Sequence, residues 1–281
     1  MQKFSEWIGK KQISEDRCDQ RSIQMLQALL NQKDQTIQEV PHLFHWMNFP
    51  HVVNQSEIGS DGHPQKGDFL PPIPFPRRMW AGSRLEFIQP ILIGQNLRRV
   101  SEIEDIQFKQ GKNGALYFVT LNHLIYADDI LVIKEQQDIV YKQDTPPTPP
   151  SSTINPPSIS PELNYSFKQQ YTLDTTALFR YSALTFNGHK IHYDRSYATQ
   201  IEGYPGLVVH GPLLATLLMQ TLHDKYPDKI IHKFEFRAIK PVFDFNEFYI
   251  CGDVHEQSAE LWIEHVDGQI AMKAKVVFQE S

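Results

Sequence analysis

The sequence predicts an α+β fold built from two similar halves, each an antiparallel sheet wrapped around a central helix. Its 281 residues, 41% apolar and 21% charged, have the composition of a globular protein and suffice for two domains. Seven of the 19 prolines lie in residues 144–161, near the middle of the chain. A pattern at residues 84–91 also recurs, with a two-residue gap, at residues 233–242. These features favour two copies of one α+β unit.

The first half is expected to begin with a short helix at residues 22–30, because its apolar side chains repeat at helical spacing. A loop rich in Pro, Gly and His follows and includes Asp61-Gly62-His63-Pro64. Residues 111–114, Gly-Lys-Asn-Gly, predict a hairpin turn. Segments rich in Ile, Val, Leu and aromatic residues are the expected strands: 84–100, 115–126 and 130–133.

The second half repeats this plan. A strand at residues 165–173 precedes a short helix with Asp174 as its predicted N-cap, and a long apolar helix follows at residues 212–222. Four further strands are expected at residues 231–239, 247–254, 258–265 and 269–278. The predicted domains are therefore a first unit at 1–143, a stiff Pro-rich linker at 144–161 and a second unit at 162–281.

Charge and cysteine content exclude several classes of function. Lys and Arg number 27 against 33 Asp and Glu, a net charge of −6, so no global basic field exists to bind a nucleic acid or an anionic membrane. The two cysteines, Cys18 and Cys251, form no disulfide framework or thiolate zinc site. The N-terminus carries no apolar signal segment, and the longest nearly apolar run has 14 residues, too few to span a bilayer. We expect a soluble, cytoplasmic protein.

The densest polar cluster is Thr-Phe-Asn-Gly-His-Lys-Ile-His-Tyr-Asp at residues 185–194, between the two helices of the second half. Irregular polar backbone between buried elements is a common place for a site. Residues 202–213 lead into the long helix, which is expected to start near Gly211 with Pro212 in its first turn. We therefore expect the functional site where these two segments meet.

These two blocks resemble the MaoC-like, hotdog-fold hydratases and dehydratases of acyl thioesters, whose signature is D-x-N-P-x-H followed by a helix opening with H-G. Asn187 stands at the Asp position, His189 at the Asn, Lys190 at the Pro and His192 at the His. The variant is more similar to the subgroup of mesaconyl-CoA and itaconyl-CoA hydratases and type 2 hydroxyacyl-thioester dehydratases. Residues 67–72 and 76–82 resemble the degenerate first hotdog of that subgroup.

The resemblance implies a double hotdog whose second half is catalytic. Hydration of an enoyl thioester needs a base for water and donors for the developing enolate. His192 is the predicted acid/base, Asn187 is expected to orient the water, and the N–H of Gly211 at the positive end of the helix is expected to polarise the thioester carbonyl. Asn187 cannot accept a proton at neutral pH as the family's Asp does. The resemblance therefore places acid/base work on His192.

Further residues are expected to bind substrate. Arg77 and Arg78, from a Pro-rich loop, are predicted contacts for an acyl carboxylate or CoA. The other predicted substrate-binding residues are His189, Lys190, Tyr193 and His210. No metal is expected, because the pair His189 and His192 lacks a third ligand at a recognised spacing. A lone histidine beside an apolar helix is more often a satisfied core residue, so these roles depend on the surrounding pattern.

The predicted function is a hydro-lyase converting itaconyl-CoA or mesaconyl-CoA to citramalyl-CoA, with no cofactor because CoA is part of the substrate. A medium- or long-chain 3-hydroxyacyl-thioester dehydratase, an acyl-CoA thioesterase and a non-catalytic thioester-binding module are alternatives. The itaconyl-CoA or mesaconyl-CoA hydro-lyase predicts an arginine near the acyl end, whereas the medium- or long-chain dehydratase predicts an apolar tunnel. Either CoA or acyl-carrier protein fits as carrier, the stereochemistry of water addition is open, and an exposed sheet edge is compatible with a homodimer.

Overall fold

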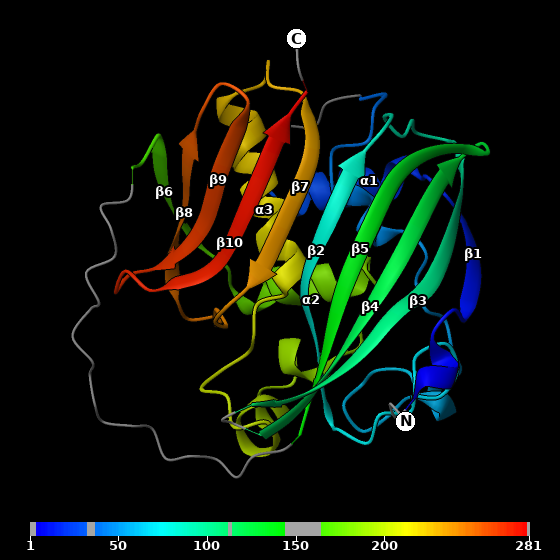
Figure 1. The fold of residues 1–281 in the computed structure, drawn as a ribbon. Coiled ribbons are helices and arrows are strands. Elements are labelled where there is room, and N and C mark those ends of the chain that lie inside the picture. The colour runs from blue at the N-terminus through cyan, green and yellow to red at the C-terminus, as the bar shows by residue number, and fades with distance from the viewer. Residues whose placement is uncertain (1–3, 33–36, 112–113, 144–163, 280–281) are drawn as a thin grey trace.

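The computed structural model describes residues 4–32, 37–111, 114–143 and 164–279. The first half contributes β1 (Lys11–Arg17), β2 (Arg77–Phe87), β3 (Asn96–Gly111), β4 (Gly114–Ala127) and β5 (Ile130–Lys142). The second half contributes β6 (Phe167–Thr172), β7 (Ile231–Ala238), β8 (Glu247–Val254), β9 (Ser258–His265) and β10 (Ile270–Phe278). All ten strands form one antiparallel sheet, in the order β1-β3-β4-β5-β2-β7-β10-β9-β8-β6 (Figure 1).

Each strand of the first half has a counterpart in the second half: β1 and β6, β3 and β8, β4 and β9, β5 and β10, β2 and β7. With these pairs, the strand order is the same from either edge of the sheet. The halves join at β2 and β7, where Leu85 lies directly opposite Phe234. These two residues occupy the same place in the predicted repeat, so the sheet has an approximate two-fold relation at this pair. A continuous sheet across the junction leaves no unpaired edge between the halves.

Backbone hydrogen bonds after β2 and β7 repeat the same pattern. The N–H groups of Ile88 and Gln89 both donate to the carbonyl of Val132. At the equivalent place in the second half, the N–H groups of Ile239 and Lys240 both donate to Ala271. Because backbone geometry is independent of side-chain identity, this match supports the faint repeat more strongly than the sequence does.

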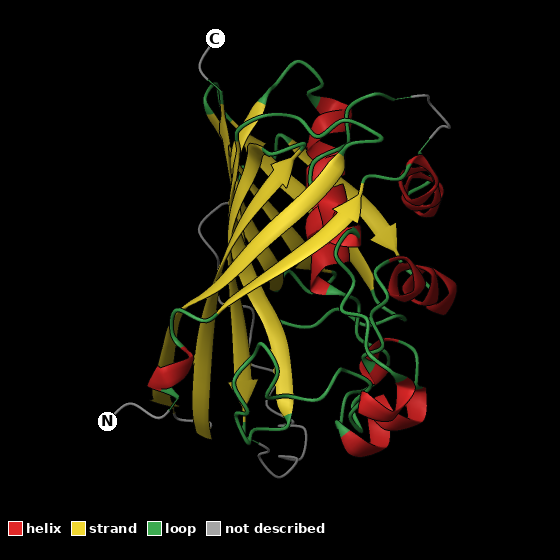
Figure 2. Ribbon diagram, turned by 90° about the vertical axis from the view of Figure 1, so that its right-hand side faces the viewer, coloured by secondary structure: helices red, strands yellow, loops and turns green. Residues whose placement is uncertain are grey.

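Three α-helices lie on one side of the curved sheet (Figure 2): α1 (Gln20–Leu29), α2 (Thr175–Leu184) and α3 (Gly211–Lys225). Asp19 and Asp174 cap α1 and α2 with their side chains, as predicted for Asp174. Helix α3 is apolar on almost every face, the pattern of a helix surrounded by protein. Its buried residues are Leu213, Leu214, Ala215, Thr216, Leu217, Leu218, Met219, Thr221 and Leu222.

The first half has a much smaller counterpart of α3. Isolated bridges pair Glu39 with Leu92 and Val208 with Phe243 at equivalent places, so the chain after Val40 corresponds to the chain that enters α3. That stretch contains the short 3₁₀ turns Phe44–Met47 and Gln55–Glu57. Among the described residues of the first half, no long helix takes the central place that α3 has in the second half.

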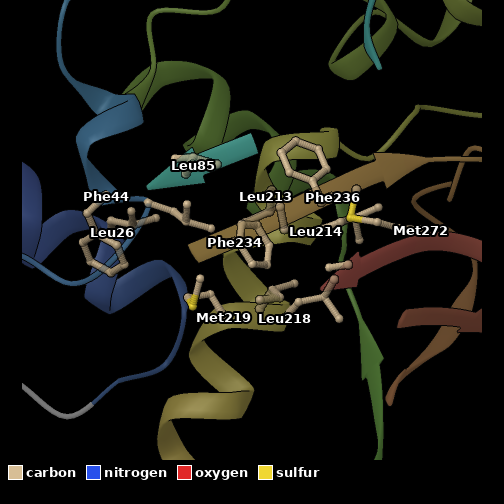
Figure 3. Close-up of a cluster of buried hydrophobic side chains, with 14 of the residues drawn as sticks. Leu26, Phe44, Leu85, Leu213, Leu214, Leu218, Met219, Phe234, Phe236 and Met272 are labelled. Carbon is tan, nitrogen blue, oxygen red and sulfur yellow. The ribbon is translucent and has the colours of Figure 1, made fainter. Parts of the chain in front are cut away.

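The core is continuous across both halves. Phe234 and Phe236 of β7 pack between α3 and the first half, where Leu85 and Phe44 complete the cluster (Figure 3). Burial of such side chains from water is the main stabilising term, about 25 cal/mol per Å² of apolar surface. A second, smaller cluster lies wholly in the first half and includes Ile103, Val119 and Tyr141.

Several strand boundaries differ from those expected. The segment 84–100 contains the end of β2 and the start of β3, separated by a turn in which Gly94 has φ +92°. The strand expected at 130–133 extends to Lys142. The sequence pattern did not predict this extension, because Glu135 and Gln137 face inward among polar partners and interrupt the apolar alternation. The predicted linker, 144–161, lies outside the described residues. Within the described residues, no helix is long and apolar enough to cross a membrane.

Candidate active site

The polar loop between α2 and α3 meets a loop of the first half. The backbone N–H of Lys190 donates to the carbonyl of Asp61 at 2.9 Å. Gly62, with φ +90°, passes so close to Gly188 that a Cβ on Gly62 would fall 1.9 Å from the Gly188 oxygen. Only glycine permits both this backbone conformation and this approach. The site is thus built from both halves of the chain.

His192 is held in one tautomer. It ends a 3₁₀ turn, Lys190–His192, and its Nδ1 lies 2.7 Å from the carbonyl oxygen of Val208. Because a carbonyl oxygen only accepts, Nδ1 carries the hydrogen and Nε2 presents a lone pair. Burial lowers the pKa of His192 to about 4, although the bond to Val208 opposes the shift. His192 is therefore neutral at pH 7 and has the form of a base.

His210 and Gly211 lie at the start of α3. The His210 ring stacks on His192 with centroids 3.7 Å apart, and its Nε2 lies 2.9 Å from Ser182 Oγ. Burial, followed by the charges of His192 and His189, lowers the pKa of His210 well below its ordinary value. Gly211 is the first residue of α3, where backbone N–H groups have no acceptor within the helix. The His192 ring therefore lies at the positive end of α3.

Asn187 and His189 shape the loop. The Asn187 side-chain oxygen accepts a hydrogen bond from the backbone N–H of His189 at 3.0 Å, which closes a local turn. The His189 ring lies edge-on to His192, with centroids 5.4 Å apart. Burial and the neighbouring histidines lower the pKa of His189 to about 2. The structure thus brings together Asn187, His189 and His192 with the two residues at the start of α3.

Three other predicted contacts lie around the loop with partners of their own. Tyr193 donates its hydroxyl to the Gly188 carbonyl, and Lys190 lies over the ring of Tyr197, 5.3 Å from its centroid. Arg77 is paired with Glu202, with Nε 3.2 Å from Oε2. These side chains hold the loop segments in place, and their contact with substrate stays a prediction.

An Asp–His pair from the first half lies against this cluster. Asp61 Oδ2 is 3.0 Å from His63 Nδ1, and the His63 ring lies on His189 with centroids 4.1 Å apart. Burial alone would raise the pKa of Asp61, but hydrogen bonds from His63 and the charge of Arg78 hold it well below its ordinary value. The ligand-type atoms of Asp61, His63 and His189 all lie within 4.8 Å of one another. Asp61 and His63 were not among the predicted site residues; the Asp-Gly-His-Pro sequence at 61–64 is the signal that indicates a turn there.

A cavity of about 160 Å³ with mixed lining opens beside this pair, starting at Pro64 and Gln65. Its apolar lining residues include Phe69, Leu70, Leu121 and Ile139. Arg78 from β2 and Arg99 from β3 line it, with Asp68 also contributing a carboxylate that is 74% exposed. Its other polar lining groups are Gln12, His51, Ser101, His123 and Gln137. The prediction selected Arg78 but missed Arg99, whose inward orientation depends on the register of β3.

The Arg99 side chain is held in place, but not all of its hydrogen-bond donors have a partner. Its guanidinium lies over Phe49, 4.8 Å from the ring centroid, and its Nε is buried with no hydrogen-bond partner among the described residues. Burial lowers the pKa of Arg99, whereas the charges of Glu135 and Asp16 raise it. A buried guanidinium N–H without an acceptor is unfavourable unless a ligand supplies one. Among the described groups that line the cavity, Arg99 is thus the one with a buried unpaired donor that an anionic ligand could fill.

The fold and the site together define a double hotdog of the MaoC-like dehydratase type. A crystal structure of HtdX from Mycobacterium tuberculosis has the same fold, with a TM-score of 0.69 over 96% of this chain and all of that chain at 15% identity. A MaoC-like dehydratase from Phytophthora capsici gives a TM-score of 0.68 over 98% of this chain and 96% of that one at 13% identity. The predicted fold class is thereby confirmed.

The chain belongs to the hydroxyacyl-thioester dehydratase type 2 family, whose sequence model matches residues 43–244. It is 41% identical to the mesaconyl-C(4)-CoA hydratase of Chloroflexus aurantiacus over 96% of both chains. It is 28% identical to the mitochondrial hydroxyacyl-thioester dehydratase type 2 of Schizosaccharomyces pombe, over 92% of this chain and 94% of that one. The resemblance read from residues 185–213 is confirmed.

Proposed function

We propose that the protein is a hydro-lyase that adds water reversibly to an enoyl-CoA thioester carrying a second carboxylate, such as mesaconyl-CoA or itaconyl-CoA, with citramalyl-CoA as product. The observation that carries the proposal is the fixed tautomer of His192, whose ring stacks on His210, the N-cap of α3. The 41% identical relative named as a mesaconyl-C(4)-CoA hydratase supports the acyl group. CoA enters as part of the substrate, and the reaction requires no separate cofactor.

In the proposed reaction, Nε2 of His192 takes a proton from water while the water oxygen bonds to the β-carbon. The electron pair of the double bond moves to the thioester oxygen, where the Gly211 N–H and the helix dipole stabilise the enolate. The enolate then collapses as the α-carbon takes a proton. General acid/base participation of this kind contributes typically ~10² to 10⁴ in rate.

The cavity lined by Arg78 and Arg99 favours a dicarboxylic substrate over a long apolar one. Arginine presents several N–H donors in a planar fork that matches a carboxylate. A medium- or long-chain acyl group would find apolar contacts at Phe69, Leu70, Leu121 and Ile139, but it would leave the buried Arg99 Nε without an acceptor. We assign this role to the unit of residues 1–143, as a degenerate hotdog that shapes the acyl pocket, and catalysis to the unit of 162–281.

A thioesterase or a non-catalytic binding module would use the site differently. A hotdog thioesterase commonly activates water with a carboxylate, and Asn187 in the motif cannot do so. A non-catalytic binding module does not require a base with a fixed tautomer at the end of a helix, so the retained His192 argues against it.

We propose separately that the protein can form a homodimer through an edge of its sheet. The strands β1 and β6 end the sheet, and sedimentation measures whether either edge pairs with a second copy.

The test is incubation of the purified protein with mesaconyl-CoA, itaconyl-CoA and crotonyl-CoA, followed by product mass and free thiol. We expect products heavier by one water, faster turnover of the dicarboxylic substrates, and a loss of ~10² to 10⁴ in kcat for His192→Gln. His223→Gln, at the exposed end of α3, is the matched control and should retain full activity. Release of free CoA without a hydrated product would instead assign a thioesterase.

A further inference from the structure

Hydration requires two proton transfers, and His192 accounts for one. The proton for the α-carbon comes either from His192, which returns the one it took from water, or from a second group that gives its own. Asn187 stands where the family motif has Asp, and its oxygen is engaged by the His189 N–H. An amide does not exchange protons at neutral pH. A second proton donor would therefore lie elsewhere in the site.

A carboxylate does reach the site, but from the other half of the chain. Asp61 bonds to His63 twice, through Oδ1 to the backbone N–H and through Oδ2 to Nδ1, each at 3.0 Å. Since an ionised carboxylate only accepts, His63 Nδ1 carries a hydrogen and Nε2 points away from Asp61. An aspartate that orients a histidine and stabilises its cation is a recurrent arrangement in proton transfer.

The loop that carries this pair is fixed against the second half at three points. The Asp61 carbonyl accepts from the Lys190 N–H, the backbones of Gly62 and Gly188 are in contact, and the His63 ring lies on His189. His189 in turn lies edge-on to His192. The two predicted proton carriers are therefore separated by one imidazole ring.

We infer that His63, oriented by Asp61, is the second acid/base group of the proposed hydro-lyase. In hydration, the protonated form of His63 gives its Nε2 proton to the α-carbon of the enolate, and His192, neutral at the start, holds the proton taken from water. His63 ends neutral and His192 ends as imidazolium, so protons and charge balance, and exchange with solvent restores the starting state. In dehydration each group takes the opposite part. The inference rests on the proposed function.

The charges around His63 define its pH dependence. The pKa of His63 lies below its ordinary value, because burial and the charges of Arg78 and Lys66 outweigh the Asp61 carboxylate, which faces Nδ1 and favours the imidazolium. The imidazolium is therefore the minor form at pH 7, and Asp61 is the group that stabilises it. His189 covers one face of the ring and is itself neutral at pH 7, since burial lowers its pKa to about 2. Removal of the Asp61 charge should therefore make His63 lose its proton at lower pH.

The same atoms offer a different chemistry, because Asp61, His63 and His189 present ligand-type atoms within 4.8 Å of one another. Two imidazoles and a carboxylate suit a divalent cation such as Zn²⁺. The direct contact of Asp61 Oδ2 with His63 Nδ1 favours the proton pair, since a metal would need both atoms to turn toward it. A chelator distinguishes the two.

The experiment compares kcat and its pH profile for the wild type, His63→Gln and Asp61→Asn with mesaconyl-CoA. We expect His63→Gln to lose ~10² to 10⁴ in kcat with little change in KM. Asp61→Asn should lose less, and the high-pH limb of its profile should move to lower pH. Added imidazole should partly restore His63→Ala, which a purely structural role of His63 would not allow. Thermal unfolding checks that each variant folds.

Asp253 and His255 provide a matched control, because they have the same Asp-x-His spacing, with Oδ2 3.5 Å from Nε2. Asp253 lies near the end of β8 and His255 is exposed just after it. Asp253→Asn and His255→Gln should leave kcat and the pH profile unchanged. Full activity of folded His63→Gln overturns the inference but not the proposed function. Loss of wild-type activity with a chelator, restored by Zn²⁺, replaces the proton pair by a metal site. A wild type that hydrates no thioester overturns both.

Discussion

Gly62 and Gly188 cross at the boundary between the two halves, with room for no side chain on Gly62. The crossing fixes the loop that carries Asp61 and His63 against the loop that carries Asn187 and His189. The hydrogen bond from the Lys190 N–H to the Asp61 carbonyl joins the same two loops. Backbone contact therefore sets the distance between the two parts of the site.

A methyl group at this crossing should disable the site. Gly62→Ala adds both a strained φ of +90° and a Cβ 1.9 Å from the Gly188 oxygen. Gly94→Ala has a similar φ of +92° with nothing within 4 Å of the added Cβ, so it isolates the backbone strain of about 1–3 kcal/mol. We expect both variants to unfold at a lower temperature than the wild type, and kcat to fall only in Gly62→Ala. Equal activity in the two would contradict the positioning role of the crossing.

Two substitutions distinguish the contribution of the Gly211 N–H from the contribution of its missing side chain. Gly211→Pro removes the N–H, and the backbone before it tolerates proline because His210 has φ −61° and ψ 128°. Gly211→Ala keeps the N–H, and its Cβ would meet only the Trp80 carbonyl, at 4.0 Å. If the N–H stabilises the enolate, kcat should fall ~10² to 10³ for the proline variant and stay near wild type for alanine. Similar losses in both would assign the effect to crowding.

Arg99 should determine the acyl group. Loss of a charge-assisted hydrogen bond costs about 1.5–3 kcal/mol, so Arg99→Gln should lower kcat/KM for mesaconyl-CoA by ~10- to 150-fold. Turnover of crotonyl-CoA, which lacks the second carboxylate, should not fall. Arg98→Gln is the control, since the neighbouring arginine points to the other face of β3 and pairs with the exposed Asp129. A parallel loss for both substrates in Arg99→Gln would place the arginine outside the acyl pocket.

The buried histidines should make the protein sensitive to mild acid. His192 and His189 have pKa values of about 4 and about 2, below the ordinary 6.5 of the unfolded chain, so the unfolded state binds more protons below pH 6.5. The free energy of unfolding should therefore fall as the pH drops from about 6.5 to 4, by up to about 1.4 kcal/mol per pH unit for each histidine. Urea unfolding across this range measures the slope, which should be shallower in His192→Gln. An unchanged slope would mean that His192 is protonated in the folded protein.

Local patterns were sufficient for most of the second half. The bounds expected for β8 and β9 agree with the structure, and Asp174 caps α2 as predicted. Strand alternation and helix capping depend on neighbouring residues, so they can be read from a short window. The first half was harder, because β5 carries inward-facing Glu135 and Gln137 that interrupt the apolar alternation.

The sequence by itself determined the α+β class, the duplicated plan and the placement of His192 and Gly211 near one helix terminus, because these follow from short-range periodicity and from one contiguous motif. Only the tertiary structure brought Asp61 and His63 to His189, across more than 120 residues of chain. It likewise decided that Arg99 faces a cavity, since a strand residue points inward or outward according to its register with the neighbouring strands. Contacts of this range depend on how the two halves pack, which no local pattern records.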